Sequence, residues 1–229
     1  LVHGVLVRRL SVRGQGQTKQ SGDLESLRDA QLLYPSPGLR VRVREAVHDE
    51  VLGVICSPSH VSFTDKSNLV ATLRGQVNAI MVVTEPFATA YGIDEIAGSI
   101  VVDIGAGTTD IARVYGTFPT DDDQVTITEA GDWLDLQLMD LIKKKYTGAQ
   151  VTKDMVRKWK EASSYVGGDA HEVTVELSVD GKRQVVDIGD LILEACELII
   201  PKIGNAIKRN VAGADPEYQQ ILRNNIILS

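Results

Sequence analysis

The sequence has little of what builds a disulfide framework, a zinc site or a membrane span. Its 229 residues include two cysteines, Cys56 and Cys196, which lie far apart in apolar surroundings and form no CxxC motif. We therefore expect two reduced, packed thiols. The four histidines have no metal-ligand spacing with one another or with the cysteines. No apolar run approaches the roughly twenty residues that a helix needs to cross a bilayer, so no direct membrane span is expected.

An excess of positive charge is also absent. The net charge is −7 and the isoelectric point is near 5.1, which disfavours general nucleic-acid binding. Hydrophobic residues make up 43% of the chain and charged residues 24%, enough to bury one sizeable core or two smaller ones. The apolar stretch at residues 1–6 is too short for the core of a signal peptide, so we expect a cytoplasmic protein.

The first 48 residues fit poorly with the rest of the chain. They are rich in arginine, and the Gly- and Gln-rich segment 14–19 is typical of a flexible link. This segment is no phosphate-binding P-loop, because the Gly-Lys-Ser/Thr core is missing. Residues 24–33 are compatible with a short helix, and residues 39–44 alternate like a strand with a cationic, solvated face.

A regular alternation of strands and helices begins at residue 51. The pattern predicts a buried strand at 51–55, a helix capped by Thr64 or Asp65 that runs to about residue 77, and a second strand at 79–83. Pro86 suits the first turn of a further helix and leaves Glu85 at its entrance. This order indicates an α/β sheet.

The most informative stretch is residues 100–114. An apolar run ends in Asp103, the chain passes through Gly105 and Gly107, and two threonines lead into a second apolar segment. We interpret this as a strand, a phosphate-cradling turn and a strand, because glycines let successive N–H groups converge on an anion. Asp103, at the end of the strand, is placed to hold a metal-bound or attacking water.

Two other interpretations of this stretch are open from the spacing alone. Gly105 and Gly107 supply two of the three glycines of a dinucleotide fingerprint, but Asp110 occupies the third position. The segment after Asp110 also alternates as a strand, where a dinucleotide fold would open a helix. An ordinary hairpin turn remains the other alternative.

Charged residues recur along the second half of the chain. Asp132 is predicted to cap a helix at 133–145, and Thr152 caps the next one. On that next helix an apolar stripe faces the core, while Arg157, Lys160 and Glu161 lie on other faces, the usual pattern of a solvated surface. Glu85, taken alone, is an acid favoured by the dipole at a helix N-terminus.

Turn signals divide the last third of the chain. Asp180-Gly181 predicts a hairpin between strands at 173–179 and 184–186. Asp187 is expected to cap a long apolar helix that Pro201 kinks or interrupts. Pro216 opens another helix, and a strand begins at residue 226.

Residues 102–110, Val-Asp-Ile-Gly-Ala-Gly-Thr-Thr-Asp, resemble the second phosphate loop of the actin, sugar kinase and heat-shock-70 superfamily. The acidic Asp-Ile-Gly-x-Gly-Thr-Thr form resembles the bacterial actin branch, and within it the filament proteins of magnetosomes. The resemblance runs from about residue 50 to residue 229. It implies an α/β fold of the actin-like, ribonuclease H-like type, with mixed sheets, flanking helices and an incomplete first domain.

The resemblance also implies a set of site residues for ATP or GTP with Mg²⁺. Glu85, in a Glu-Pro-Phe element, would position the attacking water, and Asp103 would hold Mg²⁺ through water. The superfamily binds adenine and ribose beside an Arg-x-x-Lys-Glu element, which residues 157–161 resemble. The cofactor-binding residues implied in this way are Gly105, Ala106, Gly107, Thr108, Thr109, Gly131, Arg157, Lys160 and Glu161.

By the same resemblance the chain divides into three parts. Residues 1–98 would be a partial, divergent domain I, residues 99–131 with 187–229 subdomain IIA, and residues 132–186 subdomain IIB. The first phosphate hairpin, Asp-x-Gly-Thr, and the adenosine-binding glycine turn after residue 229 are missing from the sequence. We therefore expect a truncated chain with weakened ATP binding, because each lost charge-assisted hydrogen bond costs about 1.5–3 kcal/mol.

The implied function is that of a cytoskeletal ATPase that forms dynamic filaments and aligns or positions magnetosomes. Its expected partners are further copies of itself, related actin-like filaments and magnetosome-associated proteins. One alternative is a non-catalytic paralogue that only associates with such filaments, and another is a cell-shape actin homologue. A sugar or acetate kinase of the same superfamily is disfavoured, because the sequence has no sugar-binding signature.

Overall fold

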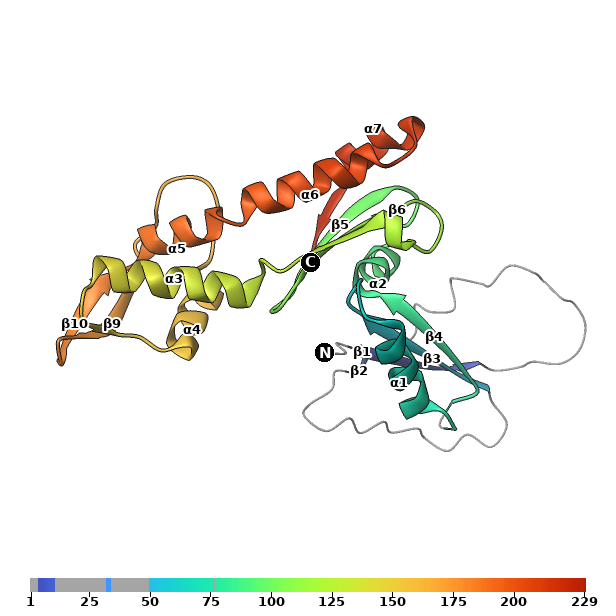
Figure 1. Cartoon of the computed structure of the whole chain (residues 1–229), viewed down its shortest axis with the longest axis horizontal. Helices are drawn as coiled ribbons and strands as arrows, with labels where there is room; N and C mark the ends of the chain where they lie inside the picture. Colours follow the sequence, from blue (N-terminus) through green and yellow to red (C-terminus); the bar gives the residue numbers. More distant parts are fainter. Residues whose placement is uncertain (1–3, 11–31, 34–49, 76) are drawn as a thin grey trace, which may run out of the picture.

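The computed structural model describes residues 4–10, 32–33, 50–75 and 77–229. The predicted link at 14–19 and the predicted strand at 39–44 lie outside these residues. Of the short helix predicted at 24–33, residues 32 and 33 form a strand instead, and the others lie outside the described part. The chain is elongated, with an outer lobe formed by residues 131–197 at one end (Figure 1).

The first sheet has the strand order β2-β1-β3-β4. Strands β1 and β3 are antiparallel, whereas β3 and β4 are parallel and are joined through helix α1. The Ser62 hydroxyl caps α1, because it accepts a hydrogen bond from the Asp65 N–H at 3.1 Å, so the predicted caps Thr64 and Asp65 are wrong. The helix also ends before residue 77. The bounds are β1 Gly4–Leu10, β2 Leu32–Leu33, β3 Glu50–Ser57, α1 Phe63–Leu73 and β4 Ala79–Thr84.

Helix α2 (Glu85–Gly92) joins the first sheet to the second. Pro86 lies in its first turn, as predicted. Its buried face contributes Phe87 and Ala90 to a core shared with strand residues of both sheets, among them Val54 and Val101. Glu85 is thereby fixed between the two sheets by apolar packing on the same short helix.

The second sheet has the order β11-β5-β6-β7. The predicted strand, turn and strand are confirmed, since β5 and β6 form an antiparallel hairpin around residues 105–108. The strand predicted to begin at residue 226 is confirmed as β11, which lies parallel to β5 with Ile227 opposite Val101. The bounds are β5 Ser99–Ile104, β6 Thr109–Val114, β7 Gln124–Ile127 and β11 Ile226–Leu228.

Helices α6 (Ile200–Ala212) and α7 (Pro216–Asn224) belong to this second sheet. Helix α6 packs against β6 and β7, with Ile203 and Ala206 in a core that includes Ile111 of β6. Pro201 lies in the first turn of α6, so the predicted interruption of the long apolar helix is confirmed. The preceding helix, α5 (Gly189–Glu197), shares its core with the outer lobe instead.

The outer lobe combines helices α3 and α4 with a three-stranded sheet of order β10-β9-β8. Its core includes Leu138, Ile142 and Leu177. The hairpin at Asp180-Gly181 is confirmed, and both residues have positive φ angles, 50° and 76°. The bounds are α3 Gly131–Lys145, β8 Ala149–Gln150, α4 Lys153–Ser163, β9 Thr174–Val179 and β10 Lys182–Asp187.

The three remaining predicted helix caps have different outcomes. Thr152 caps α4 as predicted, since its hydroxyl accepts from the Met155 N–H. Asp132 does not cap α3, whose N-cap is Ala130, because the Asp132 carboxylate is paired with cations of α4. Asp187 precedes the N-cap of α5 but still accepts from the Gly189 N–H at 2.9 Å.

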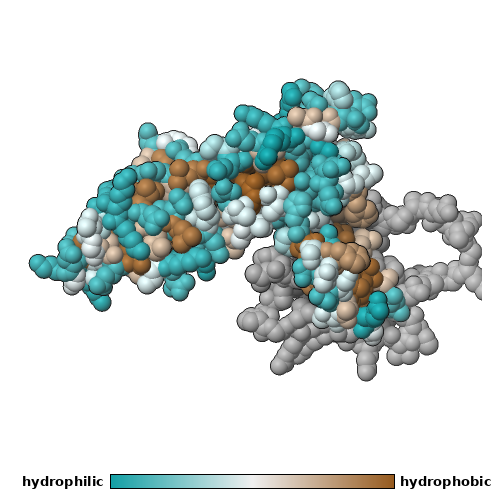
Figure 2. Space-filling view, in the orientation of Figure 1, coloured by the Kyte–Doolittle hydropathy of each residue, from teal (hydrophilic) through white to brown (hydrophobic). Residues whose placement is uncertain are grey.

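Apolar side chains remain partly exposed where α5 meets α6. Leu198 is 41% and Ile200 47% exposed, and Figure 2 shows brown residues along this stretch in a largely hydrophilic face. Both cysteines are free thiols, as expected, and burial raises the pKa of each. No helix in the described part of the chain is both long and apolar enough to cross a bilayer.

Candidate functional site

The glycine-rich loop is a tight turn with an open outer edge. The Gly105 N–H donates to the Thr108 carbonyl at 2.9 Å and closes the turn between β5 and β6. Ala106 and Gly107 are exposed. Thr109 is buried and its hydroxyl donates to the Glu129 carbonyl at 2.8 Å, so that hydroxyl is already engaged inside the protein. The exposed backbone at 106–107 is the part of the loop that a ligand can approach.

The first turn of α3 is attached directly to this loop. The Gly131 N–H donates to the Gly105 carbonyl at 3.0 Å, and the Asp132 N–H donates to the Ala106 carbonyl at 2.7 Å. A Cβ on residue 131 would lie 3.2 Å from the Gly105 oxygen and 3.4 Å from the Lys160 Nζ. Glycine suits residue 131 because the loop backbone and the Lys160 side chain both approach it closely.

Cations of α4 face acids of α3 beside the same loop. Arg157 donates to Asp132 at 2.8 Å and to Asp135 at 3.3 Å, and these two carboxylates raise its pKa, with Asp135 the larger cause. Lys160 Nζ lies 2.6 Å from Asp135 and donates to the Gly131 carbonyl at 2.7 Å. Glu161 is exposed on α4. The structure thus brings Arg157 and Lys160 to the loop joint.

Lys153 completes this ionic layer from the start of α4. Its Nζ lies 3.2 Å from the Asp132 carboxylate. This cation, with Arg157, lowers the pKa of Asp132, and the hydrogen bond from Lys153 is the largest cause. The charged face predicted for this helix is therefore partly an interface with α3.

The acid that the sequence pattern assigns to water positioning lies on the other side of the loop. Burial raises the pKa of Glu85 to about 7, and the charges of Asp103 and Asp110 also contribute to this rise. Glu85 Oε1 is buried and has no hydrogen-bond partner among the described residues. A carboxylate with a pKa near neutrality can accept and return a proton, as general acid–base chemistry requires.

Asp103 stands at the end of β5, half-buried, directly before the loop. Its Oδ1 accepts a hydrogen bond from the Ser229 hydroxyl at 3.1 Å. In the antiparallel register it lies opposite Asp110 of β6. The ends of the two loop strands therefore carry one carboxylate each, and both act on the Glu85 charge.

Asp110 was not selected from the sequence, although it connects three segments. It is 2% exposed. One carboxylate oxygen accepts from the Ser59 N–H at 3.3 Å and from the Thr126 hydroxyl, and the other accepts from the Thr108 hydroxyl at 3.2 Å. Its position across the hairpin from Asp103 was the available signal. Asp135, also missed, is an acid within an apolar stretch of α3.

The acidic side of the loop is compatible with Mg²⁺ held through water. The described residues contain no cluster of three or more acidic, histidine or cysteine side chains arranged to hold a metal directly. Mg²⁺ in nucleotide sites usually keeps several waters and binds one or two carboxylates with the phosphates. The half-buried Asp103 carboxylate beside an exposed loop fits that chemistry.

Comparison with known proteins identifies the family. The model for the MreB/Mbl protein family matches residues 38–229. The chain belongs to this family. Actin-like protein MamK of Magnetospirillum gryphiswaldense is 36% identical over 182 residues, which cover 80% of this chain and 51% of MamK.

Solved structures of MamK confirm the actin-like fold. The MamK double helical filament superposes with a TM-score of 0.74 at 34% identity, over 81% of this chain and 57% of the MamK chain. A non-polymerising MamK mutant bound to AMPPNP gives a TM-score of 0.69 at 35% identity, over 77% of this chain and 54% of the mutant chain. This chain therefore spans about half the length of the MamK proteins that it matches.

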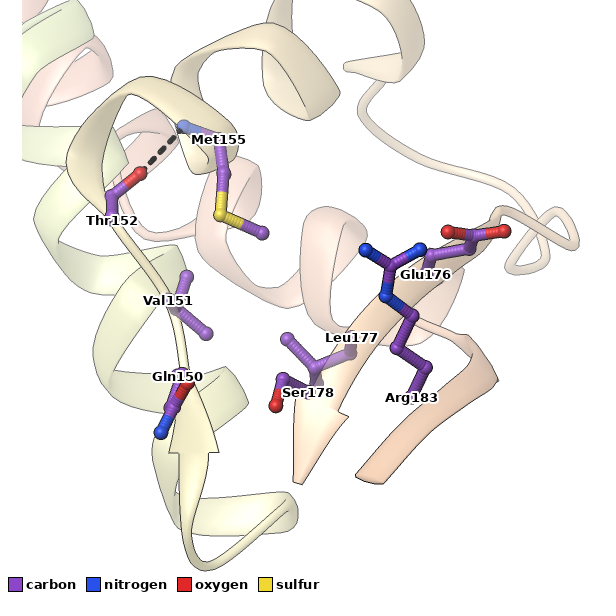
Figure 3. Close-up of a pocket in the computed structure, with 8 residues that line it drawn as sticks. All are labelled: Gln150, Val151, Thr152, Met155, Glu176, Leu177, Ser178 and Arg183. Carbon is purple, nitrogen blue, oxygen red and sulfur yellow. Dashed lines mark hydrogen bonds between the residues drawn. The ribbon is translucent and has the colours of Figure 1, made fainter. Parts of the chain in front are cut away.

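Two cavities lie away from the loop, each of about 570 Å³. One is in the outer lobe, where Val151, Met155 and Leu177 form an apolar wall and Arg183 and Glu176 lie on the β10 and β9 strands beside it (Figure 3). The other lies between the end of β3 and helix α1. Neither of these two cavities is lined by residues 105–108.

Proposed function

We propose that this chain is the nucleotide-binding part of an actin-like filament protein, in which ATP with Mg²⁺ binds across residues 105–108. One observation carries the proposal. The exposed glycine-rich backbone is flanked by the acids Glu85 and Asp103 on one side and by the Lys160 joint on the other. In this arrangement Glu85 and Asp103 would act on the phosphate chain. Lys160 would orient the nucleoside.

Each residue has a separate role in this proposal. Backbone N–H groups of Ala106 and Gly107 face the phosphates, with the Thr108 hydroxyl nearby. Gly105 contributes by shaping the turn, since its N–H donates to the Thr108 carbonyl. The Thr109 hydroxyl already donates to the Glu129 carbonyl, so Thr109 would contact the nucleotide only through its backbone. Bound Mg²⁺ would neutralise phosphate charge, and Asp103 would orient its water ligand.

The water attacking the γ-phosphate would be oriented by Glu85, whose carboxylate is half-buried between the two sheets. Gly131, Arg157, Lys160 and Glu161 form the adenosine side in the proposal. GTP is the alternative nucleotide, because no contact to the base edge distinguishes the two.

The biological role that we propose follows that of MamK. The chain, or the longer protein to which it corresponds, would assemble with copies of itself or with related actin-like filaments in the cytoplasm. Magnetosome-associated proteins are the proposed further partners, and nucleotide hydrolysis would destabilise the polymer. Support comes from the MamK structures, one of a double helical filament and one of a mutant bound to AMPPNP.

The three-part division also stays a proposal: residues 1–98, residues 99–131 with 187–229, and residues 132–186. Helix α5 shares its core with the outer lobe, so the boundary along α5 is its weakest point. Limited proteolysis should cut between the parts, and a first cut inside α3 would contradict the division.

The proposal is tested first by titrating the 229-residue chain with a fluorescent ATP analogue and Mg²⁺. Saturable binding that inorganic triphosphate and ADP both displace is expected. Absence of binding would instead favour a non-catalytic chain that only associates with filaments, which co-sedimentation with MamK polymer would reveal.

The second test uses a version that carries family N- and C-terminal segments. Glu85→Ala and Asp103→Ala should each slow hydrolysis by roughly 10²–10³-fold and leave assembly largely intact, because water positioning acts in the transition state. Lys160→Ala should weaken nucleotide binding instead, since its contact acts on ground and transition states alike. A pure change of Michaelis constant in Asp103→Ala would refute the assignment.

A further inference from the structure

The carboxylate of Asp135 is a buried charge that the proposed roles do not use. The residue is 0% exposed on α3. Burying a carboxylate is costly unless cations pair with it. Its partners come from α4, with Lys160 Nζ at 2.6 Å and Arg157 Nε at 3.3 Å.

Lys160 transmits this pairing to the phosphate loop. Its side chain is 12% exposed, and its Nζ donates to the Gly131 carbonyl at 2.7 Å. The N–H of Gly131 in turn donates to the Gly105 carbonyl at 3.0 Å. The ammonium group therefore lies against the joint of the loop and α3, where Gly131 links it to the loop backbone.

A lysine ammonium on a flexible four-carbon stem does not hold such a position unaided. Without a fixed partner it samples several rotamers and moves toward water. Asp135 can fix it because the carboxylate is itself immobile, buried in α3 and held from a second direction by Arg157.

We propose that Asp135 is a positioning residue, which holds the Lys160 ammonium at the joint of the loop and α3 for contact with the nucleoside part of a bound nucleotide. The inference rests on the proposed function, in which Lys160 belongs to the adenosine side. Asp135 itself touches no nucleotide. Arg157, its other cation, is also held by Asp132 at 2.8 Å, so the effect of Asp135 is assigned to Lys160.

Two other roles for Asp135 predict different results. If it only neutralised Lys160, its removal would leave an uncompensated positive charge and strengthen binding of any phosphate. If it only stabilised the fold, its removal would weaken binding of every ligand together. Positioning alone predicts weaker binding of a nucleotide and unchanged binding of a phosphate chain without a nucleoside.

The experiment compares Asp135→Asn with the unmodified 229-residue chain and with Asp140→Asn, an exposed acid on the same helix. Fluorescent ADP with Mg²⁺ is titrated, and inorganic pyrophosphate is measured by competition. We expect Asp135→Asn to weaken ADP binding about tenfold, with pyrophosphate within about twofold and Asp140→Asn unchanged. Equal weakening of both ligands, or tighter binding of both, overturns the proposal.

A second comparison covers the case in which Asp135→Asn does not fold. The double variant Asp135→Asn with Lys160→Met has no unpaired buried charge, and it is compared with Lys160→Met alone. The two should bind ADP equally, because Asp135 acts only through Lys160. Further weakening in the double variant overturns the positioning role. If the unmodified chain binds neither ADP nor pyrophosphate, the proposed function fails and this inference fails with it.

Discussion

The two sides of the glycine-rich loop differ in how their polar groups are satisfied. On the α3–α4 side, Asp132 and Asp135 each pair with two cations of α4, and Asp135 Oδ1 contacts Lys160 as an ion pair at 2.6 Å without a hydrogen bond. On the side of β3, β4 and α2, four buried oxygens have no hydrogen-bond partner within the described part of the chain. These are Ser57 Oγ, Ser59 Oγ, Thr84 Oγ1 and Glu85 Oε1.

This difference separates a side whose carboxylates are ion-paired from a side with unpaired buried oxygens. An unpaired buried polar group costs about 1–3 kcal/mol, so proteins pair nearly all such groups with protein atoms or ordered water. In the proposed function, the α3–α4 side is preformed to orient the nucleoside, and the Glu85 side has unpaired polar atoms that can hydrogen-bond to water. The pKa values agree, since that of Asp132 is lowered and that of Glu85 is raised.

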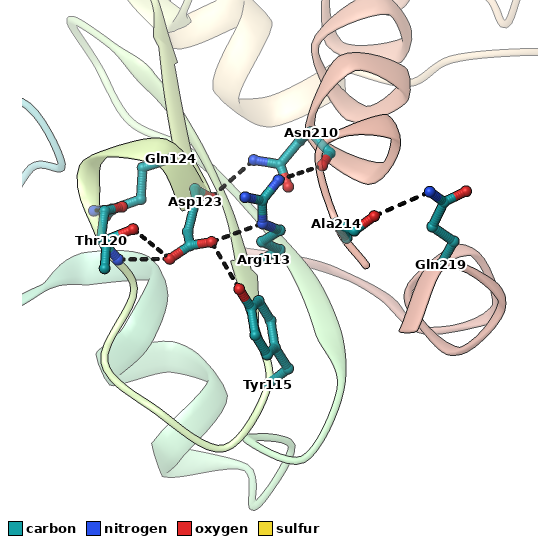
Figure 4. A network of polar contacts seen from close by, with 8 residues as sticks. All are labelled: Arg113, Tyr115, Thr120, Asp123, Gln124, Asn210, Ala214 and Gln219. Atoms are coloured by element: carbon teal, nitrogen blue, oxygen red, sulfur yellow. Dashed lines mark hydrogen bonds and ion pairs between the residues drawn. The ribbon is translucent and has the colours of Figure 1, made fainter. Parts of the chain in front are cut away.

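The largest effect is expected at an ion pair in which both side chains are buried. At the far end of the loop hairpin, Arg113 Nε lies 2.7 Å from Asp123, and its Nη1 donates to the Asn210 carbonyl of α6 (Figure 4). Arg113→Met should lower the free energy of unfolding by about 3–5 kcal/mol, because the buried Asp123 carboxylate loses its cation and keeps only its hydrogen bonds from Thr120 and Tyr115. Urea denaturation measures this directly.

The matched control is the exposed pair of Lys145 and Asp190, whose side chains are 38% and 53% exposed. Lys145→Met should cost about 0–1 kcal/mol, because water screens an exposed pair. Similar losses in the two variants would mean that burial does not decide the strength of pairing in this chain.

The next largest effect concerns Asp110, which joins the loop and β7 to the segment after β3. Its carboxylate accepts from the Ser59 N–H and from the hydroxyls of Thr108 and Thr126. Asp110→Ala leaves these donors without their acceptor and should cost about 3 kcal/mol in thermal unfolding. It should also increase amide hydrogen exchange at residue 59. Unchanged exchange there would show that Asp110 does not tie β3 to the loop.

Local signals in the sequence predicted the parts of this fold that depend on neighbouring residues. The loop hairpin, the turn at Asp180-Gly181 and the helix break at Pro201 follow from glycine, proline and alternation within a few residues. The resemblance to bacterial actins then supplied the actin-like fold, which composition and periodicity alone left as a general α/β sheet.

The sequence predictions that were wrong or missing concern contacts between distant segments. Aspartate is a common helix cap, but the Asp132 carboxylate instead forms ion pairs with Lys153 and Arg157 of α4. The sequence around Asp135 does not distinguish it from a surface acid, and its burial depends on the packing of α4 against α3. Asp110 accepts a hydrogen bond from the distant Ser59 N–H, which the sequence around Asp110 does not indicate. A single sequence carries no signal for such pairs, because the partners are set by the packing of whole elements.

A smaller effect should distinguish the two threonines of the loop. The Thr109 hydroxyl is buried and donates to the Glu129 carbonyl, so Thr109→Val should lower stability by about 1–2 kcal/mol and leave nucleotide affinity unchanged. Thr108 is only half-buried, and Thr108→Val should change affinity more than stability. Thermal melts and ATP-analogue titrations of both variants check the pair. The reverse pattern would place the ligand-facing hydroxyl at Thr109.

The smallest effect is a loss of stability with rising pH, which we expect from Glu85 on the side of β3, β4 and α2. Glu85 has a pKa of about 7 in the folded chain, against 4.5 ordinarily, so the folded state retains a proton that the unfolded state has lost. Stability from this group is therefore full below about pH 4.5 and falls as pH rises to about 7. Glu85→Gln keeps the shape without the charge, and it should melt about 2–4 °C above the parent at pH 8, with a smaller difference at pH 5. Asp132→Asn, on the paired side, should instead melt below the parent at pH 8. A Glu85→Gln difference that did not grow between pH 5 and pH 8 would show that burial does not hold the proton on Glu85.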